Sequence, residues 1–228
     1  ILYDETIKQT SNSNKTIPDL ISSSGAIPGI KVDTGAKILS GSPEEKITEG
    51  LDGLRERLKE YYKLGARFTK WRGVYNISNK HPSKLSIHSN SHALARYSAL
   101  VQECGMVPIV EPEVLMDGNH SSEDCFNKTS EVIKKCFKEL IFNNIDLTGI
   151  ILKPNMILPG NKSNEKISSE KVAKLTLECL KENVPTDVPG IAFLSGGQTE
   201  IQATENLNLI NKQNDTNFIM TYSYGRAL

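Results

Sequence analysis

Charged side chains close several short apolar runs in this sequence, and most of them stand in pairs separated by one residue. The pairs are Lys31 with Asp33, Lys70 with Arg72, and Glu111 with Glu113, while Lys153 ends a further run. Side chains of a β-strand alternate between two faces, so the members of each pair lie on the same face. Lysines and carboxylates gathered on one face can carry out amine and acid–base chemistry.

Lys153 is the candidate nucleophile, because the three residues before it are all apolar. A lysine amine has a reference pKa of about 10.4, and both burial and nearby cations free it to attack a carbonyl. Lys70 and Lys31 are the candidate cations, and Glu111 is the candidate group for proton transfer during Schiff-base formation and hydrolysis. A structural Lys–Glu ion pair is the alternative that these residue types leave open.

Two glycine-containing segments are typical of phosphate binding. Ser195, Gly196 and Gly197 follow an apolar run and precede a helix that we expect to begin near Thr199. The N–H groups of such a turn approach an anion closely, and the helix N-terminus adds a favourable field. Ser223-Tyr224-Gly225-Arg226 adds further N–H groups and a bidentate guanidinium. Leu-Ser-Gly-Gly-Gln is also a signature of ABC-type ATPases, but the Walker A loop that they require is absent from this sequence.

Seven apolar runs are expected to form the strands that position these residues, namely 1–3, 29–32, 68–71, 107–110, 149–152, 190–194 and 218–222. Between them, apolar residues recur with helical period in stretches that end at Gly65 and Gly105, in 132–141, and from Ser168 onward. Strands that alternate with helices pair in parallel, with right-handed crossovers.

This alternation predicts an α/β fold, a TIM (β/α)8 barrel that lacks one strand, since a complete barrel takes about 250 residues. The competing fold, an open doubly wound sheet, often has a GxGxxG turn after its first strand, and this sequence has none. The carboxyl ends of barrel strands meet at one rim, where barrel enzymes keep their active sites. One charge at a strand end is more often an ordinary loop residue, but its repetition over many strands favours a site.

Composition excludes several other classes. The 27 basic and 27 acidic residues cancel, which gives no support to a nucleic-acid partner or a polybasic membrane surface. No apolar stretch approaches the roughly 18 to 20 residues of a membrane span. The four cysteines form no CxxC pair and no signal-peptide pattern is present, so we expect a cytoplasmic protein. His88 and His92 lie four apart on an expected surface helix, and we assign no metal to them.

Six ordered motifs resemble those of class I fructose-1,6-bisphosphate aldolase: Gly-Ile-Lys-Val-Asp, Lys-Trp-Arg, Pro-Ile-Val-Glu-Pro-Glu, Leu-Lys-Pro-Asn-Met, Phe-Leu-Ser-Gly-Gly-Gln and Ser-Tyr-Gly-Arg-Ala-Leu. The resemblance covers essentially all 228 residues. It implies a glycolytic and gluconeogenic lyase that needs neither metal nor cofactor. The implied reaction is the reversible cleavage of fructose 1,6-bisphosphate to dihydroxyacetone phosphate and glyceraldehyde 3-phosphate through a Schiff base.

The resemblance also implies roles for the candidate residues. Lys153 matches the Schiff-base lysine, Glu111 its acid/base group and Lys70 the lysine beside it. Arg72 matches a substrate-phosphate arginine, Lys31 a further site lysine, and Glu113 a glutamate that supports the charge network. Ser195, Gly196, Ser223, Gly225 and Arg226 match the binding residues of the other phosphate. Asp33 and Gly197 complete our set of candidate substrate-binding residues.

We expect the sequence to be a stretch of a longer protein, because it lacks an initiator Met and closes as a new element begins. Residues 1–228 are then a single partial barrel domain, from about the second strand to the eighth. The family's first strand, with a catalytic aspartate, and its last helix and tail, with a tyrosine, are expected in the parent chain.

The resemblance implies a homotetramer, with cytoskeletal or membrane-associated proteins as further partners. A scaffold protein on the same fold is an alternative of another class, but the joint presence of Lys153, Glu111, Lys70 and Arg226 favours the enzyme. A transaldolase-like lyase is weakened by the two phosphate-type segments. A metal-dependent class II aldolase is disfavoured by the small number of histidines.

Overall fold

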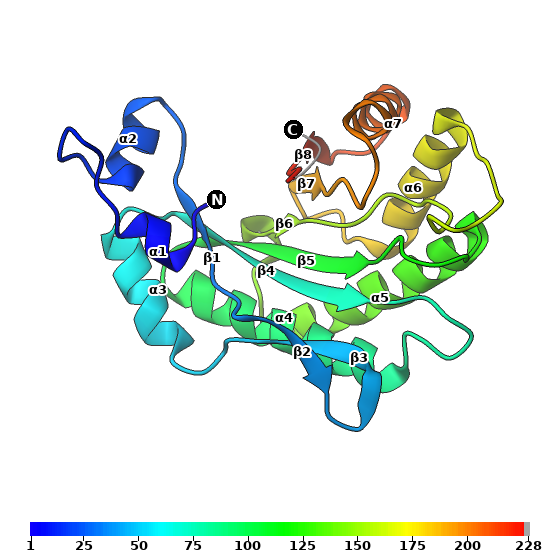
Figure 1. Cartoon of the computed structure of the whole chain (residues 1–228), viewed down its shortest axis with the longest axis horizontal. Coiled ribbons are helices and arrows are strands. Elements are labelled where there is room, and N and C mark those ends of the chain that lie inside the picture. Colours follow the sequence, from blue (N-terminus) through cyan, green and yellow to red (C-terminus); the bar gives the residue numbers. More distant parts are fainter. Residues whose placement is uncertain (226–228) are drawn as a thin grey trace.

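Six parallel strands form one curved sheet in the computed structural model, which describes residues 1–225 (Figure 1). They are β1 (Gly29–Lys31), β4 (Phe68–Tyr75), β5 (Val107–Val114), β6 (Ile151–Leu152), β7 (Gly190–Phe193) and β8 (Ile219–Tyr222). Their order in the sheet is their order along the chain, and Leu2 adds a parallel bridge beside β1. A doubly wound sheet would reverse this order at a switch point. The arrangement is therefore that of an incomplete barrel, as the alternation predicts.

Helices connect these strands and cover the outside of the sheet (Figure 1). The five longer helices are α3 (Leu54–Lys63), α4 (Lys84–Glu103), α5 (Ser122–Phe142), α6 (Ser169–Asn183) and α7 (Glu200–Gln213). The N-terminal segment contributes α1 (Asp4–Ile7) and α2 (Ile17–Ser23), and the short 3-10 helix η1 (Leu147–Gly149) precedes β6. A Ser or Thr side chain caps α4, α5, α6 and α7, and satisfies N–H groups that the first turn leaves unpaired.

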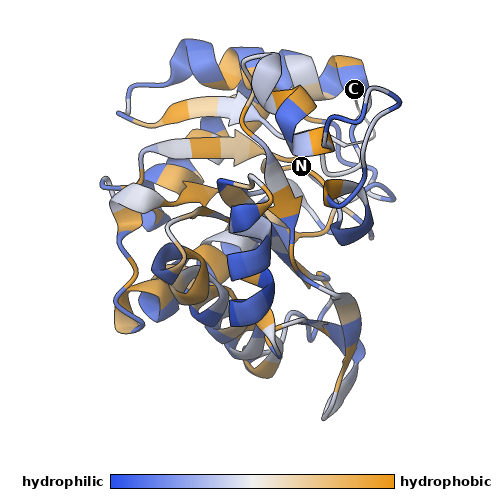
Figure 2. Ribbon diagram, turned by 90° about the vertical axis from the view of Figure 1, so that its left-hand side faces the viewer, coloured by the Kyte–Doolittle hydropathy of each residue, from blue (hydrophilic) through white to orange (hydrophobic). Residues whose placement is uncertain are grey.

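The core lies between the sheet and its helices. Helix α4 buries Leu94 and Tyr97, and the Tyr97 ring packs against Trp71 of β4 with 5.4 Å between ring centroids. Figure 2 shows the corresponding pattern, in which the helices carry hydrophobic and hydrophilic residues on different sides. This burial holds the barrel rim in place, because apolar area removed from water stabilises the fold by about 25 cal/mol per Å².

The structure corrects four expectations about the elements. The run 149–152 gives only a two-residue strand, since Gly149 belongs to η1 and β6 begins at Ile151. Residues 1–3 do not form a strand, since only Leu2 bridges β1 before α1 begins. β4 and β5 each run four residues further than expected, so Arg72, Glu111 and Glu113 lie inside the strands rather than after them.

An antiparallel hairpin was not expected. It consists of β2 (Gly35–Leu39) and β3 (Ser42–Glu49). The hairpin is fixed by contacts that no local pattern reveals: Thr48 Oγ1 donates to the Arg72 carbonyl (2.6 Å), and Asn90 Nδ2 donates to the Lys46 carbonyl (2.9 Å). Within residues 1–225, no helix has the length and apolar character needed to cross a membrane.

Candidate active site

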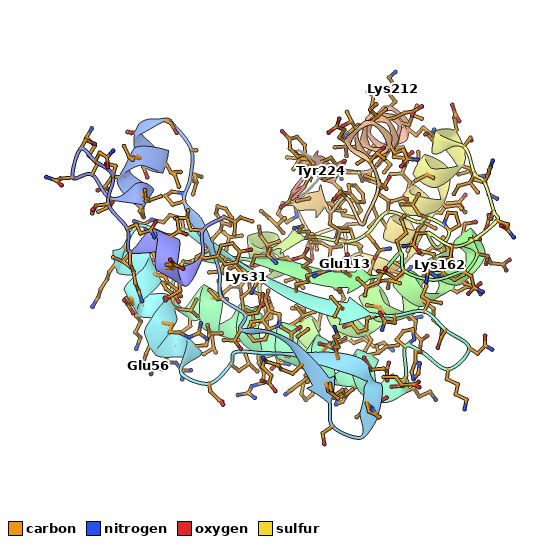
Figure 3. The ribbon with its side chains drawn as sticks, viewed as in Figure 1. Lys31, Glu56, Glu113, Lys162, Lys212 and Tyr224 are labelled. Carbon is orange, nitrogen blue, oxygen red and sulfur yellow. The ribbon has the colours of Figure 1, made fainter. Side chains whose placement is uncertain are left out.

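Most of the predicted site residues meet at the carboxyl end of the sheet. Lys70 and Arg72 belong to β4, Glu111 and Glu113 belong to β5, and Lys153 follows β6 directly. In the parallel pairing of these strands, Arg72 lies opposite Glu111. Figure 3 shows Glu113 toward the end of β5 and Lys31 on β1. The prediction that the charged strand ends converge is thereby confirmed for these residues.

Glu111 stands at the centre of this group. Its Oε2 atom lies 2.7 Å from Lys70 Nζ, and its Oε1 atom lies 3.1 Å from Lys153 Nζ. The three side chains are almost completely buried, with exposed fractions of 4% for Glu111, 12% for Lys70 and 9% for Lys153. One carboxylate thus joins two lysines inside the protein, and it can pass a proton to or from either amine.

The electrostatics favour a reactive amine at Lys153. Burial lowers the pKa of Lys153 most, the Glu111 carboxylate opposes this shift, and the charge of Lys70 adds to it, so that the pKa lies below its ordinary value. A lower pKa increases the fraction of neutral amine, which is the form that attacks a carbonyl.

A second ion pair flanks the first, since Arg72 Nε donates to Glu113 Oε2. Burial opposes the guanidinium charge, but the hydrogen bond and charge of Glu113 raise the pKa of Arg72 above its ordinary value. Burial also raises the pKa of Glu113, against the effect of Arg72. The pair therefore holds Arg72 as a cation at the cavity, with one side of its guanidinium engaged.

Lys31 and Asp33 are bound chiefly to each other. Lys31 Nζ lies 2.6 Å from Asp33 Oδ1 and 2.8 Å from the Asp33 carbonyl oxygen. The other carboxylate oxygen of Asp33 is buried and has no partner among residues 1–225. Lys31 stands opposite Lys70 in the pairing of β1 with β4, and the charge of Asp33 acts on Arg72. The pair therefore lies beside the Glu111 group, although neither residue is among those that line the cavity described next.

A cavity of about 590 Å³ opens over the central group. Arg72, Glu111, Glu113 and Lys153 line one part of it, and the opposite part is lined by Ser195, Gly196, Gly197, Ser223 and Gly225. Arg226 lies outside the described residues. The cavity therefore places an ionisable amine and an anion-binding loop around one volume, as expected for a phosphorylated carbonyl substrate.

The glycine turn is built to present its backbone. Gly196 and Gly197 have φ angles of +59° and +85°, a conformation that favours glycine. Gln198 Nε2 donates to the Ser195 carbonyl (2.8 Å), and Asn206 holds the Gln198 amide oxygen (2.7 Å). Among the described residues, nothing accepts from the N–H groups of Gly196 and Gly197, so both can bind an anion.

Ser223 is used differently from the expectation. Its N–H donates to the Phe193 carbonyl (2.8 Å), continuing the pairing of β7 with β8. This N–H is therefore engaged, and only the hydroxyl of Ser223 can serve a ligand. The Ser-Tyr-Gly-Arg segment alone does not show that the N–H and the hydroxyl of Ser223 have different roles, because the hydrogen bond of the N–H depends on the neighbouring strand.

Further residues that sequence reasoning missed also line the cavity, namely Tyr3, Leu115, Met116, Asp117, Asn161 and Leu194. Most of them lie on the loops that follow β5 and β6. Asp117 follows Glu113 and Asn161 follows Lys153 within a few residues, which is a weak indication that they belong to the same site. The loops fold back over the rim, however, and no spacing rule gives that geometry.

Another cavity, of about 650 Å³, lies away from the strand-end charges and is lined in part by Thr48, Asp52, His88 and His92. The two imidazoles contact Glu139 of α5, with Nδ1 to carboxylate distances of 3.4 Å for His88 and 3.2 Å for His92. Within residues 1–225, no three or more His, Cys, Asp or Glu side chains are arranged to hold a metal ion. This cavity lacks the buried lysine that makes the first one chemically distinctive.

Comparison with known proteins supports the resemblance drawn from the motifs. The family model described as "Glycolytic: Fructose-bisphosphate aldolase class-I" matches residues 1–228. A probable fructose-bisphosphate aldolase class 1 of Xylella fastidiosa is 51% identical over 228 residues, which are 100% of this chain and 68% of the relative. The cytosolic fructose-bisphosphate aldolase 4 of Arabidopsis thaliana is 48% identical over 229 residues, covering 100% of this chain and 58% of the relative.

A solved structure of fructose-bisphosphate aldolase from Plasmodium falciparum, in complex with TRAP and a small-molecule inhibitor, superimposes with a TM-score of 0.97 at 46% identity. The match covers 100% of this chain and 66% of that one. The chain thus spans 68%, 58% and 66% of the lengths of the three proteins compared. The comparisons confirm the barrel fold and the expected membership of a family of glycolytic lyases. The chain belongs to the class I fructose-bisphosphate aldolases.

Proposed function

We propose that the protein reversibly cleaves fructose 1,6-bisphosphate to dihydroxyacetone phosphate and glyceraldehyde 3-phosphate through a Schiff base on Lys153. The observation that carries this proposal is the buried contact of Lys153 with Glu111 (3.1 Å), in a cavity whose far side is a glycine turn. The names of the family and of the relatives support the same reaction.

The reaction begins with attack of the neutral Lys153 amine on the C2 carbonyl carbon of the sugar. Glu111 donates the proton that lets the carbinolamine lose water, and an iminium forms between Nζ and C2. The electron pair of the C3–C4 bond then moves toward the iminium as the C4 hydroxyl gives up its proton. Glyceraldehyde 3-phosphate leaves, and an enamine stays on Lys153.

The second half of the reaction restores the enzyme. C3 of the enamine takes up a proton, and water hydrolyses the iminium to release dihydroxyacetone phosphate and the free amine. Lys70 contributes through charge, since it is 2.7 Å from Glu111 and lowers the pKa of Lys153. The proton that leaves the C4 hydroxyl and the proton that C3 takes up balance over the cycle, and the cleavage changes no overall oxidation state.

The substrate's phosphates are assigned to two sides of the cavity. We place one phosphate on the N–H groups of Gly196 and Gly197, with the hydroxyls of Ser195 and Ser223 beside them. Arg72 lines the other side and is the candidate for the second phosphate. Lys31, Asp33, Gly225 and Arg226 remain candidate substrate-binding residues by their match to the family motifs.

We also propose a cytoplasmic homotetramer. Support for the cytoplasmic location comes from the relatives, of which several in Arabidopsis thaliana are named cytosolic. Support for protein partners comes from the Plasmodium falciparum aldolase, whose structure was solved with TRAP. Sedimentation of the full-length protein tests the tetramer, and a monomer at micromolar concentration would contradict it.

Borohydride trapping tests the enzymatic proposal. The full-length protein is incubated with dihydroxyacetone phosphate, reduced, digested and mapped by mass spectrometry. We expect one reduced adduct on the peptide that contains Lys153, and none in a Lys153→Arg variant. If the folded protein forms no adduct while an active aldolase treated alongside does, the enzymatic function is wrong and a binding role on the same fold leads.

A further inference from the structure

The loops that follow β5 and β6 lie side by side at the rim of the barrel. Gly160 N donates to the His120 carbonyl (2.9 Å), Asn161 N to the Met116 carbonyl (2.8 Å), and Lys162 N to the Gly118 carbonyl (2.8 Å). Three main-chain hydrogen bonds therefore join residues 160–162 to residues 116–120. The first loop follows Glu111 and Glu113 of β5 and the second follows Lys153, so the contact links the two strands that supply the chemistry.

Close packing fixes the spacing of the two loops. A Cβ atom added to Gly160 would lie 2.3 Å from the Gly118 carbonyl oxygen, which is far inside van der Waals contact. Any larger residue at this position would push the loops apart. The Asn161 side chain adds a further link, because its Oδ1 atom accepts from Gly118 N (3.1 Å).

Glu165 makes a further contact between the two loops, at the start of α5. Its Oε2 atom accepts from Ser122 N (2.8 Å) and its Oε1 atom accepts from Ser122 Oγ (2.6 Å). Ser122 is buried at the first turn of α5, immediately after the first loop. The hydroxyl and N–H of Ser122 hold the pKa of Glu165 below its ordinary value, so the carboxylate is ionised at neutral pH.

These contacts bear on the shape of the cavity. Leu115, Met116 and Asp117 of the first loop line it, and so does Asn161 of the second. Met116 reaches across toward the glycine turn, since its Cε atom lies 3.9 Å from where a Cβ atom on Gly197 would be. A shift of the first loop would therefore change the width of the cavity at the end where Gly196 and Gly197 present their N–H groups.

We propose that Glu165 is a positioning residue, which ties the loop after β6 to the start of α5 and thereby sets the width of the cavity at its anion-binding end. This inference rests on the proposed function, in which the glycine turn binds a substrate phosphate. Glu165 itself touches no reacting atom. Its role is to keep Met116 at a fixed distance from the turn.

The test compares three variants of the full-length protein. Glu165→Ala removes both hydrogen bonds to Ser122, and we expect KM for fructose 1,6-bisphosphate to rise about five- to tenfold while kcat changes less than about twofold. Glu165→Gln keeps one acceptor oxygen and is expected to recover part of the loss. Asn164→Ala is the matched control, because this neighbouring side chain is exposed and makes no hydrogen bond among the described residues.

Two outcomes overturn the inference. One is an unchanged KM in a folded Glu165→Ala variant, and the other is a parallel fall of kcat and melting temperature that Glu165→Gln does not recover. Should Glu165→Ala fail to fold, Ser122→Ala removes only the hydroxyl donor and is expected to raise KM by a smaller factor. If KM is unchanged in folded Ser122→Ala, the inference is also wrong.

Failure of the proposed function gives a separate result. If the unaltered protein has no aldolase activity and forms no borohydride adduct, the reaction assigned to Lys153 is wrong. Calorimetric titration with dihydroxyacetone phosphate then tests the positioning role of Glu165 without turnover. We expect a weaker Kd in Glu165→Ala than in Asn164→Ala, and equal values would overturn the positioning role.

Discussion

Two carboxylates in this protein are each contacted by several basic side chains, and their surroundings differ. Glu111 joins Lys70 and Lys153 at the barrel rim, where their side chains are 12% and 9% exposed. Glu139 on α5 joins Lys135 (2.6 Å), His88 (3.4 Å) and His92 (3.2 Å). These three partners are 33%, 58% and 45% exposed.

The two clusters differ in chemistry because their basic side chains differ in exposure. At the rim, burial is the main reason that the pKa of Lys153 falls, and Glu111 cannot fully oppose it. On the helices, the Lys135 and His92 hydrogen bonds overcome the effect of burial and lower the pKa of Glu139, as in an ordinary ion pair. Sharing a carboxylate therefore does not make a lysine reactive, because solvent must also be removed from its amine.

Replacing the two lysines gives the largest contrast. Lys153→Met removes the nucleophile, and we expect kcat for cleavage of fructose 1,6-bisphosphate to fall by about 10⁴-fold or more. Lys135→Met removes a solvated cation and is expected to leave kcat within about twofold of the original value. Steady-state kinetics with a coupled assay measures both. Substantial activity in a folded Lys153→Met variant would show that another amine forms the intermediate.

Replacing the two carboxylates tests the acid–base role. Glu111→Gln keeps the size of the side chain but cannot exchange a proton, so we expect kcat to fall by about 10²- to 10⁴-fold. Borohydride adducts should still form on Lys153, but more slowly. Glu139→Gln serves as the control, and its kcat is expected to be unchanged. Equal kinetics in the two variants would remove the distinction between a catalytic and a structural carboxylate.

The pH dependence of kcat/KM tests whether the charge of Lys70 acts on Lys153. The charge of Lys70 contributes to the lowered pKa of Lys153, so Lys70→Met is expected to raise that pKa. Fewer amines are then neutral at a given pH, and the acidic limb of the profile moves to higher pH. We expect a loss of about tenfold at neutral pH that shrinks as the pH rises. Lys135→Met is the control and should leave the pH profile unchanged. An unchanged profile in Lys70→Met would mean that Lys70 acts only through packing.

Much of this rim could be predicted from the sequence, because local rules determine it. Alternation within strands puts Lys70 with Arg72 on one face, and parallel strands bring their carboxyl ends together. Ser168 and Thr199 cap helices where the pattern predicts a start. The lysine, carboxylate and glycine segments therefore fall around one cavity, as expected.

Features that depend on distant contacts could not be predicted. Lys31 is bound to Asp33, two residues along its own chain, whereas Lys70 contacts Glu111 of the neighbouring strand, although both lysines end similar runs. The Lys70–Glu111 contact joins residues 41 apart in the sequence, through the pairing of β4 with β5. Asp117 and Asn161 reach the cavity only because their loops fold together over the rim. The β2–β3 hairpin likewise depends on hydrogen bonds to α4 and β4.

The smallest predicted effect is on the free energy of unfolding, through Glu139 and its partners on α4 and α5. Glu139 has a lowered pKa in the folded protein, so its pairing adds stability above the ordinary carboxyl pKa of 4.5 and loses it as the pH falls through the lower folded value. Because its partners are partly exposed, we expect Glu139→Gln to cost about 1 kcal/mol or less in free energy of unfolding at neutral pH. Urea denaturation should show this cost shrinking in high salt and toward low pH. A cost that is independent of salt and pH would instead mean that Glu139 stabilises the fold through packing. Glu139 and Glu111 would then differ in how their side chains pack, rather than in how far their partners are exposed to solvent.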